Sequence, residues 1–315
     1  MGLADRHPET QFQFCYRPHR FARSFREKLP GNCRRFLLQE PLVPRRAAVF
    51  HGLNQRLPTV RLRRTVATFH DLFVLTGDYS TREFRRRFAD QARRAAAESD
   101  RIIAVSEFTA TQVHELLGVE RSRLRVVHHG VRIPAPRPVD REKIILHVGA
   151  MQIRKNIARL VQAFESAPPD WRLALAGSAG FGAEAILHAI VDSPVRERIS
   201  VLGYVSGDAL ADWYARAMIL AFPSLDEGFG IPILEAMAAG VPVLTSNRGA
   251  LAEVAGDAAV LVNPESLEEL SEGLRTMIAG EQLREDLKRR GLARAAGFTW
   301  ADAVEKTWKV YQELM

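Results

Sequence analysis

Two glutamates flank an apolar stretch in the segment DEGFGIPILEAMAAGVP. Glu227 and Glu235 lie eight positions apart, and Gly228, Phe229 and Gly230 follow the first of them. Carboxylates only accept hydrogen bonds, so they match paired hydroxyl groups such as those of a sugar or a ribose. Glycines let backbone amides approach a ligand closely, and a helix N-terminus adds positive potential suited to phosphate oxygens. The segment therefore favours a site for a ligand that carries both hydroxyls and phosphate.

Two carboxyl groups can also hydrolyse a glycosidic bond, but a glycosidase places them about 5–9.5 Å apart. Eight residues of continuous helix rise about 12 Å. This spacing favours two carboxylates that bind the two ends of a long ligand, such as a nucleotide sugar. The structural alternative for Glu235 is an exposed residue in the first turn of a helix, where the helix dipole favours a negative charge. Pro232 and Gly240 predict the two ends of that helix.

A basic pair, Arg154 and Lys155, follows the apolar run KIILHVGA at the expected start of a helix. The helix dipole disfavours two cations there by about 0.3–1 kcal/mol each, unless an anion binds to them. The pair therefore predicts a phosphate site, with an exposed basic pair as the alternative. His70 and Asp71 end another run, RTVATFHD, where a ligand cleft would lie. Other polar residues near the ends of these runs are assigned structural roles: Ser106, Asn156, His128 and His129.

The elements that must position these residues repeat one pattern on both sides of a proline-rich segment. Short apolar runs alternate with helical stretches, which indicates parallel sheets covered on both faces. The runs are TQFQFCY, AAVFHGL, RTVATFHD, RIIAVS and LRVVHHGV, then KIILHVGA, RLALAGS, ISVLGYV, MILAFPS, VPVLTS and AAVLVNP. Open parallel sheets bind ligands at the C-terminal ends of their strands. We therefore predict two Rossmann-like α/β domains that face one another across a cleft.

Three prolines, Pro134, Pro136 and Pro138, mark the boundary between the domains. Proline disfavours both helix and sheet, so this segment is typical of a linker. The final segment is an amphipathic helix that we expect to pack back toward the N-terminal domain. The predicted parts are an N-terminal domain at 1–133, a linker at 134–142, a C-terminal domain at 143–297 and the last helix at 298–315.

The net charge of +7 is unevenly distributed. Residues 1–140 hold 26 Lys and Arg against 14 Asp and Glu, a balance of +12, whereas residues 141–315 hold 18 against 23, a balance of −5. A basic domain attracts phosphates, nucleic acid or an anionic membrane surface; solvated arginine-rich helix faces are the equal alternative. No stacking aromatics or recognition helix accompany the charge, which argues against nucleic acid. Two cysteines, a polar N-terminus and no long apolar run favour a cytoplasmic protein, with peripheral contact to the inner membrane surface as an open question.

Together these segments resemble one known family. EGFGIPILE is similar to the E-x7-E signature of retaining family 4 glycosyltransferases (glycosyl transferases group 1), which have the GT-B fold. ILHVGAMQIRKNIARLVQAF, LALAGSAG, VLGYVSGDALADWYARA and AFPSLDEGFGIPILEAMAAGVPVLTSNRGALAEVAGDAAVLVNP resemble its donor-binding domain in family order. ATFHDLFVL, RIIAVSEFTATQV and VVHHGV resemble its acceptor-side domain. The likeness runs from about residue 47 to the end of the chain.

The resemblance implies transfer of a hexose from a nucleotide-diphosphate sugar to a hydroxyl of a glycan or lipid-linked acceptor. Mannose is the family-level expectation, with retention at the anomeric carbon, a role in surface polysaccharide synthesis and no separate cofactor. Glu227 would hold the sugar hydroxyls, assisted by the amides of Gly228, Phe229 and Gly230. Glu235 would hold the ribose.

The same resemblance assigns the remaining site residues. Arg154 and Lys155 would bind the donor diphosphate beside the strand-end Gly149. His70 would flank the reacting centre, and the backbone at Val205 would face the nucleobase. No His, Cys and Asp cluster has metal-ligand spacing, so we expect no metal site.

Two departures from the family pattern bear on activity. Ala150 stands where the family often has arginine, which leaves more of the phosphate binding to Arg154 and Lys155. The first residues resemble the end of the family's first helix and its second strand, so the usual first strand and glycine-rich loop are not in this sequence. The alternatives are therefore a truncated, non-catalytic module that binds a nucleotide sugar and, less favoured, a GT-B nucleotide-sugar epimerase.

Overall fold

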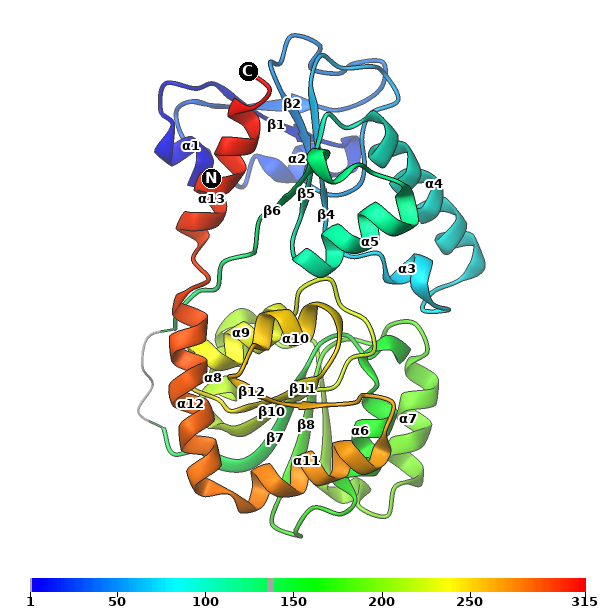
Figure 1. Cartoon of the computed structure of the whole chain (residues 1–315), viewed down its shortest axis with the longest axis vertical. Coiled ribbons are helices and arrows are strands. Elements are labelled where there is room, and N and C mark those ends of the chain that lie inside the picture. The colour runs from blue at the N-terminus through cyan, green and yellow to red at the C-terminus, as the bar shows by residue number, and fades with distance from the viewer. Residues whose placement is uncertain (1, 135–138) are drawn as a thin grey trace.

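The chain folds into two α/β domains stacked along the long axis of the molecule (Figure 1). The structure is a computed structural model that describes residues 2–134 and 139–315. Both domains are built on parallel sheets, so the predicted fold class is confirmed. Residues 135–138 of the predicted linker lie outside the described residues, and the first strand of the C-terminal domain begins at Glu142.

The strands lie close to the predicted apolar runs, apart from one that was not predicted. They are β1 (Phe12–Tyr16), β2 (Cys33–Leu37), β3 (Phe50–Gly52), β4 (Thr65–Phe69), β5 (Arg101–Ala104), β6 (Leu124–Val126), β7 (Glu142–Val148), β8 (Arg172–Ala176), β9 (Ile199–Gly203), β10 (Ala217–Phe222), β11 (Val243–Ser246) and β12 (Ala259–Val262). The helices are α1 (Gly2–Arg6), α2 (Pro18–Ser24), α3 (Phe73–Thr76), α4 (Arg82–Glu98), α5 (Glu107–Leu117), α6 (Ile157–Phe164), α7 (Ala183–Asp192), α8 (Gly207–Arg216), α9 (Ile231–Ala238), α10 (Gly249–Ala255), α11 (Leu267–Ala279), α12 (Glu281–Ala296) and α13 (Trp300–Gln312).

The C-terminal domain has a six-stranded parallel sheet in the order β12-β11-β10-β7-β8-β9. Successive side chains of β7 enter opposite cores, because neighbouring residues of a strand point to opposite faces. Ile144 and Leu146 pack in a cluster with residues of α9 and α10, whereas Ile145 packs with α6, α7 and α11. Helices therefore cover both faces, and the C-terminal ends of β7 and β10 meet at one edge beneath the N-terminal domain (Figure 1).

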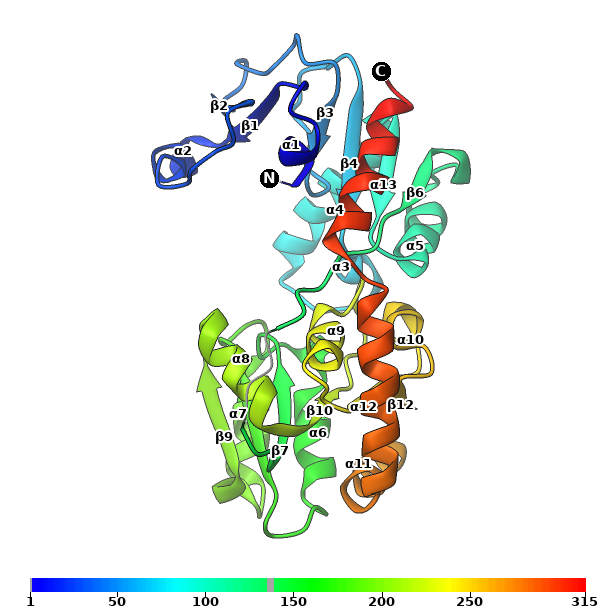
Figure 2. The ribbon, with the colours of Figure 1, turned by 90° about the vertical axis from the view of Figure 1, so that its left-hand side faces the viewer.

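The N-terminal domain contains two separate parallel sheets. Four strands pair in the order β3-β4-β5-β6, and β1 pairs only with β2 among the described residues. Figure 2 shows the β1–β2 pair standing to one side of β3 and β4. The predicted run LRVVHHGV forms a strand only over Leu124–Val126, so His128 and His129 lie in the connection that leads toward the second domain.

The last helix joins the two domains. Helix α12 belongs to the C-terminal domain, and α13 continues from it along the N-terminal domain (Figure 2). Ala303 and Val310 of α13 pack against Val66 and Ile103 of the N-terminal sheet. The Tyr311 hydroxyl also lies 2.6 Å from Nδ1 of a partly buried histidine on β3, His51. The expected return of this helix to the N-terminal domain is therefore present in the structure.

Candidate active site

The loop between β10 and α9 carries four of the predicted site residues, at 227–230, and it lies directly under the N-terminal domain. Gly230 precedes α9 with φ 103°, a left-handed conformation that favours glycine. A Cβ on Gly228 would lie 1.7 Å from the backbone oxygen of His70, so only glycine fits there. The close approach at Gly228 is to the backbone that follows β4, and the predicted approach of its amide to a ligand stays a prediction. The Phe229 ring is buried and packs edge-on against His129, 5.1 Å between centroids.

Glu227 forms a buried ionic cluster with Arg154 and Lys155. The sequence did not indicate this contact, because the residues lie far apart along the chain. The carboxylate lies 2.8 Å from Nη1 of Arg154 and also contacts the ammonium of Lys155. The three side chains are between 9% and 12% exposed. Burial raises the pKa of Glu227, but Lys155 and Arg154 outweigh it and hold the pKa below its ordinary value. The cluster therefore keeps the Glu227 carboxylate charged at the meeting point of β7 and β10, whereas burial lowers the pKa of Lys155 against the opposing effect of Glu227.

Arg154 also connects this cluster to the N-terminal domain. Its guanidinium lies 4.3 Å from the ring centroid of Phe73 on α3, a cation–π contact. Its Nη1 also donates to the backbone oxygen of Asp226 over 3.0 Å. The Asp226 carboxyl accepts a hydrogen bond of 2.5 Å from the Thr76 hydroxyl, again on α3. Burial raises the pKa of Asp226, and its second oxygen, Oδ1, is buried without a hydrogen-bond partner.

Glu235 lies apart from that cluster, in the second turn of α9 rather than the first. Its Oε2 accepts a hydrogen bond of 2.9 Å from the hydroxyl of Tyr214 on α8. Burial raises the pKa of Glu235, and burial with the nearby Glu235 charge raises that of Tyr214. The second predicted acid is thus partly buried and oriented by a tyrosine, unlike the exposed surface residue that was its alternative. Helix α9 itself spans Ile231–Ala238, within two residues of the predicted ends.

His70 follows β4 and makes contacts with both of its ring nitrogens. Nε2 lies 2.8 Å from the Leu53 oxygen, so it carries the proton that this carbonyl accepts. Nδ1 lies 3.3 Å from Nε2 of His129, and the two rings stack with centroids 5.3 Å apart. Burial lowers the pKa of His129 to about 4. For Asp71, burial raises the pKa to about 6 against the opposing charge of Arg154.

The other predicted residues occupy strand ends around the cluster. Gly149 follows β7, donates its amide to the Ala176 oxygen over 2.9 Å and lies beside the Lys155 side chain. Val205 follows β9 and is partly buried against the core, whereas the neighbouring Tyr204 is 83% exposed. Along the described parts of the chain, no group of three His, Cys, Asp or Glu side chains could hold a metal ion.

Ser106 and Asn156 have the structural roles assigned to them, and both also contact the loop that follows β10. Ser106 caps α5 by accepting from the Thr109 amide over 3.0 Å, and its hydroxyl also lies 2.7 Å from the Gly228 oxygen. Asn156 precedes α6 with a positive φ of 59°, and its amide donates to the Pro223 oxygen over 3.1 Å. Several partners of the site were missed by sequence reasoning: Phe73, Thr76, His129, Tyr214 and Asp226.

Comparison with known proteins places this geometry in context. The model of the family described as glycosyl transferases group 1 matches residues 133–294, and that of glycosyltransferase family 4 matches residues 6–133. The O-antigen chain mannosyltransferase B of Escherichia coli is 32% identical over 320 residues, which cover 90% of this chain and 84% of that protein.

Solved structures share the fold at low sequence identity. Sucrose-phosphate synthase from Thermosynechococcus elongatus superposes with a TM-score of 0.76 at 20% identity, covering 91% of this chain and 85% of that one. Anabaena HepE, solved with UDP and glucose, gives a TM-score of 0.67 at 22% identity, covering 80% of this chain and 71% of that one. Within 2–134 and 139–315, no helix is both long and apolar enough to cross a membrane.

Proposed function

Since the chain belongs to the family of glycosyl transferases group 1, we propose that it transfers a hexose from a nucleotide-diphosphate sugar to a hydroxyl of a glycan or lipid-linked acceptor. The similarity to an O-antigen mannosyltransferase supports mannose as the sugar and surface polysaccharide as the product. The observation that carries the proposal is the buried cluster of Arg154, Lys155 and Glu227 at the C-terminal edge of a parallel sheet.

The two cations are suited to a diphosphate even while they contact Glu227. An arginine side chain has five N–H donors and a lysine ammonium has three, so each retains donors beyond those that face the carboxylate. We propose that the diphosphate binds to these remaining donors beside Gly149 and that Glu227 accepts from sugar hydroxyls. The amides of Gly228, Phe229 and Gly230 would assist, with Glu235 on the ribose and the backbone at Val205 toward the nucleobase. Held in place by Glu227, the cations would need little reorganisation to stabilise the negative charge of the departing nucleotide.

The stereochemical course is proposed to be retention by departure and attack on one face of the sugar. The Glu227 carboxylate is held by Arg154 and Lys155, so it is not free to act as a nucleophile. His70 lies across the domain interface with its ring fixed by Leu53 and is proposed to flank the reacting centre. Proton NMR of the product would show an anomeric configuration equal to that of the donor, whereas an inverted product would refute this mechanism.

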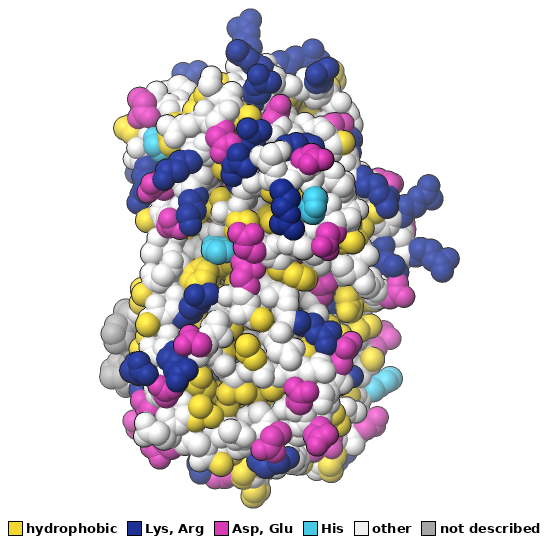
Figure 3. Space-filling model, viewed as in Figure 1, with side chains coloured by type: hydrophobic (Ala, Val, Ile, Leu, Met, Phe, Trp, Pro, Cys, Tyr) yellow, Lys and Arg dark blue, Asp and Glu magenta, His cyan; other side chains and the backbone are white. Residues whose placement is uncertain are grey.

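The basic N-terminal domain supports an acceptor that carries phosphate at an anionic surface. Figure 3 shows Lys and Arg side chains projecting from the N-terminal domain, notably over α4. Arg86, Arg87 and Arg93 lie on that helix. We propose peripheral contact with anionic lipid, which vesicle sedimentation at low salt would detect. Equal binding to neutral and anionic vesicles would contradict it.

One experiment distinguishes glycosyl transfer from two other functions, nucleotide-sugar binding alone and epimerisation. Calorimetry with UDP-, GDP- and dTDP-sugars measures donor binding, and a turnover assay with the same donors measures transfer or conversion. A glycosyltransferase binds one donor and releases its nucleotide. Binding without turnover would instead support a nucleotide-sugar-binding module, and formation of an epimer would support an epimerase. No binding of any donor would refute the proposed function.

A further inference from the structure

The first turn of α5, which we call the docking turn (Ser106–Thr109), lies against the loop that carries Glu227. The Ser106 hydroxyl donates to the Gly228 oxygen over 2.7 Å, and the Thr109 hydroxyl donates to the same oxygen over 3.0 Å. Both side chains are fully buried. Two hydroxyls of the N-terminal domain therefore donate to one carbonyl of the C-terminal domain, and this carbonyl is directly beside Glu227, the residue that we propose binds the sugar.

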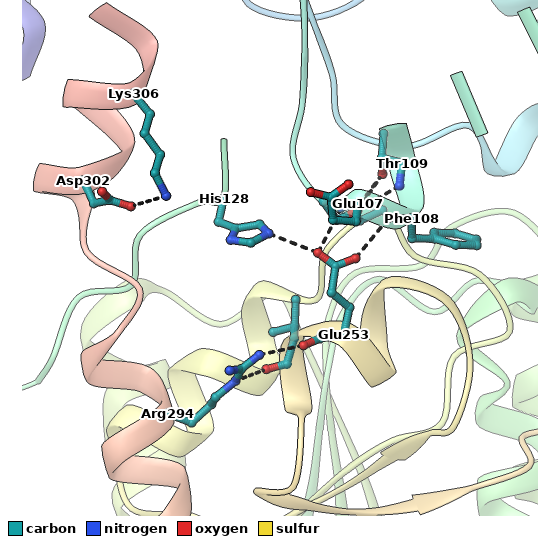
Figure 4. A network of polar contacts seen from close by, with 11 residues as sticks. Glu107, Phe108, Thr109, His128, Glu253, Arg294, Asp302 and Lys306 are labelled. Atoms are coloured by element: carbon teal, nitrogen blue, oxygen red, sulfur yellow. Dashed lines mark hydrogen bonds and ion pairs between the residues drawn. The ribbon is translucent and has the colours of Figure 1, made fainter. Parts of the chain in front are cut away.

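A second contact ties the docking turn to α10 of the C-terminal domain (Figure 4). The Glu253 carboxylate accepts from the amide of Glu107 over 2.9 Å and from that of Phe108 over 3.0 Å. It also lies 3.0 Å from Nε2 of His128. The first amides of a helix have no partner within the helix, and its N-terminus favours a negative charge. Glu253 thus satisfies two otherwise unpaired donors from the opposite domain.

Glu253 is itself held in position by α12. Glu253 and Val254 lie at the C-terminal end of α10. The Arg294 side chain donates to their backbone oxygens over 2.7 Å and 3.0 Å, respectively (Figure 4). Burial raises the pKa of Glu253, but the hydrogen bonds from His128 and the two amides outweigh it and lower the pKa. The Glu253 carboxylate is therefore charged, and Arg294 holds the end of the helix that directs it toward the docking turn.

We propose that Glu253 is a positioning residue for the transfer reaction: it seats the docking turn on the Gly228 carbonyl and so fixes the loop that presents Glu227 across the domain interface. This inference rests on the proposed function. The loop is enclosed from two directions, because Gly228 also packs directly against the His70 backbone. Both restraints come from the N-terminal domain, so the seating of the domains and the position of Glu227 are coupled.

The first test uses the variant Glu253→Gln, which keeps the size of the side chain but replaces one acceptor oxygen with a donor. It can no longer offer a separate acceptor oxygen to each amide of the docking turn. We expect hydrogen exchange at the amides of Glu107 and Phe108 to become about tenfold faster or more, because a charge-assisted hydrogen bond is lost. The matched control Glu272→Gln removes an exposed carboxylate of α11 and should leave these rates unchanged. Equal exchange in Glu253→Gln and wild type would overturn the inference.

The second test separates positioning from donor binding. With GDP-mannose as the donor, kcat of Glu253→Gln should fall about tenfold while the Kd from calorimetry stays within about twofold of wild type. Thr109→Val removes the hydroxyl that donates to Gly228 but keeps the shape, and it should reproduce the loss in kcat. Faster exchange with unchanged kcat in both variants would refute the positioning role. If the wild type turned over no donor, the proposed function would fail, whereas the exchange rates would still decide whether the docking contact exists.

Discussion

The geometry of the buried ionic cluster of Arg154, Lys155 and Glu227 predicts how one substitution changes the stability of the protein. Glu227→Gln removes one negative charge and leaves Arg154 and Lys155 without their carboxylate. The side chain keeps its volume and one acceptor oxygen, so packing is conserved and the change is almost purely electrostatic. The two cations would then repel one another in a site where each is at most 12% exposed.

The size of the effect follows from this burial. Breaking a buried ion pair by removing one partner costs about 3–5 kcal/mol, because an uncompensated charge stays buried. The amide oxygen of glutamine still accepts one hydrogen bond, which places the expected loss near the lower limit, about 3 kcal/mol of unfolding free energy. An exposed pair, by contrast, contributes about 0–1 kcal/mol. Glu272→Gln, which breaks the exposed pair with Arg275, therefore serves as the matched control.

Urea denaturation of both variants at pH 7 and pH 4 measures this difference. Because the pKa of Glu227 is lower in the folded than in the unfolded state, its contribution is present above the unfolded value of 4.5 and is lost as the pH falls through the folded value. The difference between wild type and Glu227→Gln should therefore shrink on acidification. A loss below about 1 kcal/mol at pH 7, or one that grows at pH 4, would refute the buried-cluster reasoning.

Three further predictions follow from other contacts. Gly228→Ala places a Cβ 1.7 Å from the His70 oxygen, so one of the two backbones must shift; we expect the domains to move apart and small-angle scattering to show a larger radius of gyration, and an unchanged value would count against this packing. Tyr311→Phe removes the 2.6 Å contact to partly buried His51 and should lower the free energy of unfolding in urea by about 1–3 kcal/mol, and an unchanged value would contradict this contact. Burial lowers the pKa of His51 to about 4, so the unfolded chain binds the extra proton below pH 6.5 and stability falls toward pH 4. The pKa of Asp71 is raised to about 6, so its protonation stabilises the folded state as the pH falls and opposes this trend. The decisive variant is therefore His51→Gln, whose free energy of unfolding should decline less between pH 7 and pH 5 than that of wild type.

Local sequence patterns predicted most of the secondary structure, for identifiable reasons. The buried parallel strands are short apolar runs bounded by polar or glycine residues, and such runs have few other structures open to them. Strand β2 was missed because Arg34 and Arg35 interrupt its apolar character, which a strand paired on a single side tolerates. The N-cap at Ser106 and the helix start at Pro232 were predicted because both signals lie within a few residues of the feature.

The partners of the site residues were not predictable in the same way. The sequence singled out Arg154 and Glu227 separately, but gave no measure of the distance between residues 73 positions apart. Thr76 and Asp226 lie in different domains, and their contact depends on how the domains are seated. Neither residue carries a local pattern that marks it. Residue types therefore indicated a chemistry for the site, which stays a prediction, whereas the pairings of its residues required the fold.

The most direct test is a crystal structure of the protein with a bound nucleotide-diphosphate hexose such as GDP-mannose. We predict diphosphate oxygens within hydrogen-bonding distance of Arg154 and Lys155, sugar hydroxyls at Glu227 and the ribose at Glu235. A donor bound elsewhere, or one whose diphosphate contacts neither cation, would contradict it.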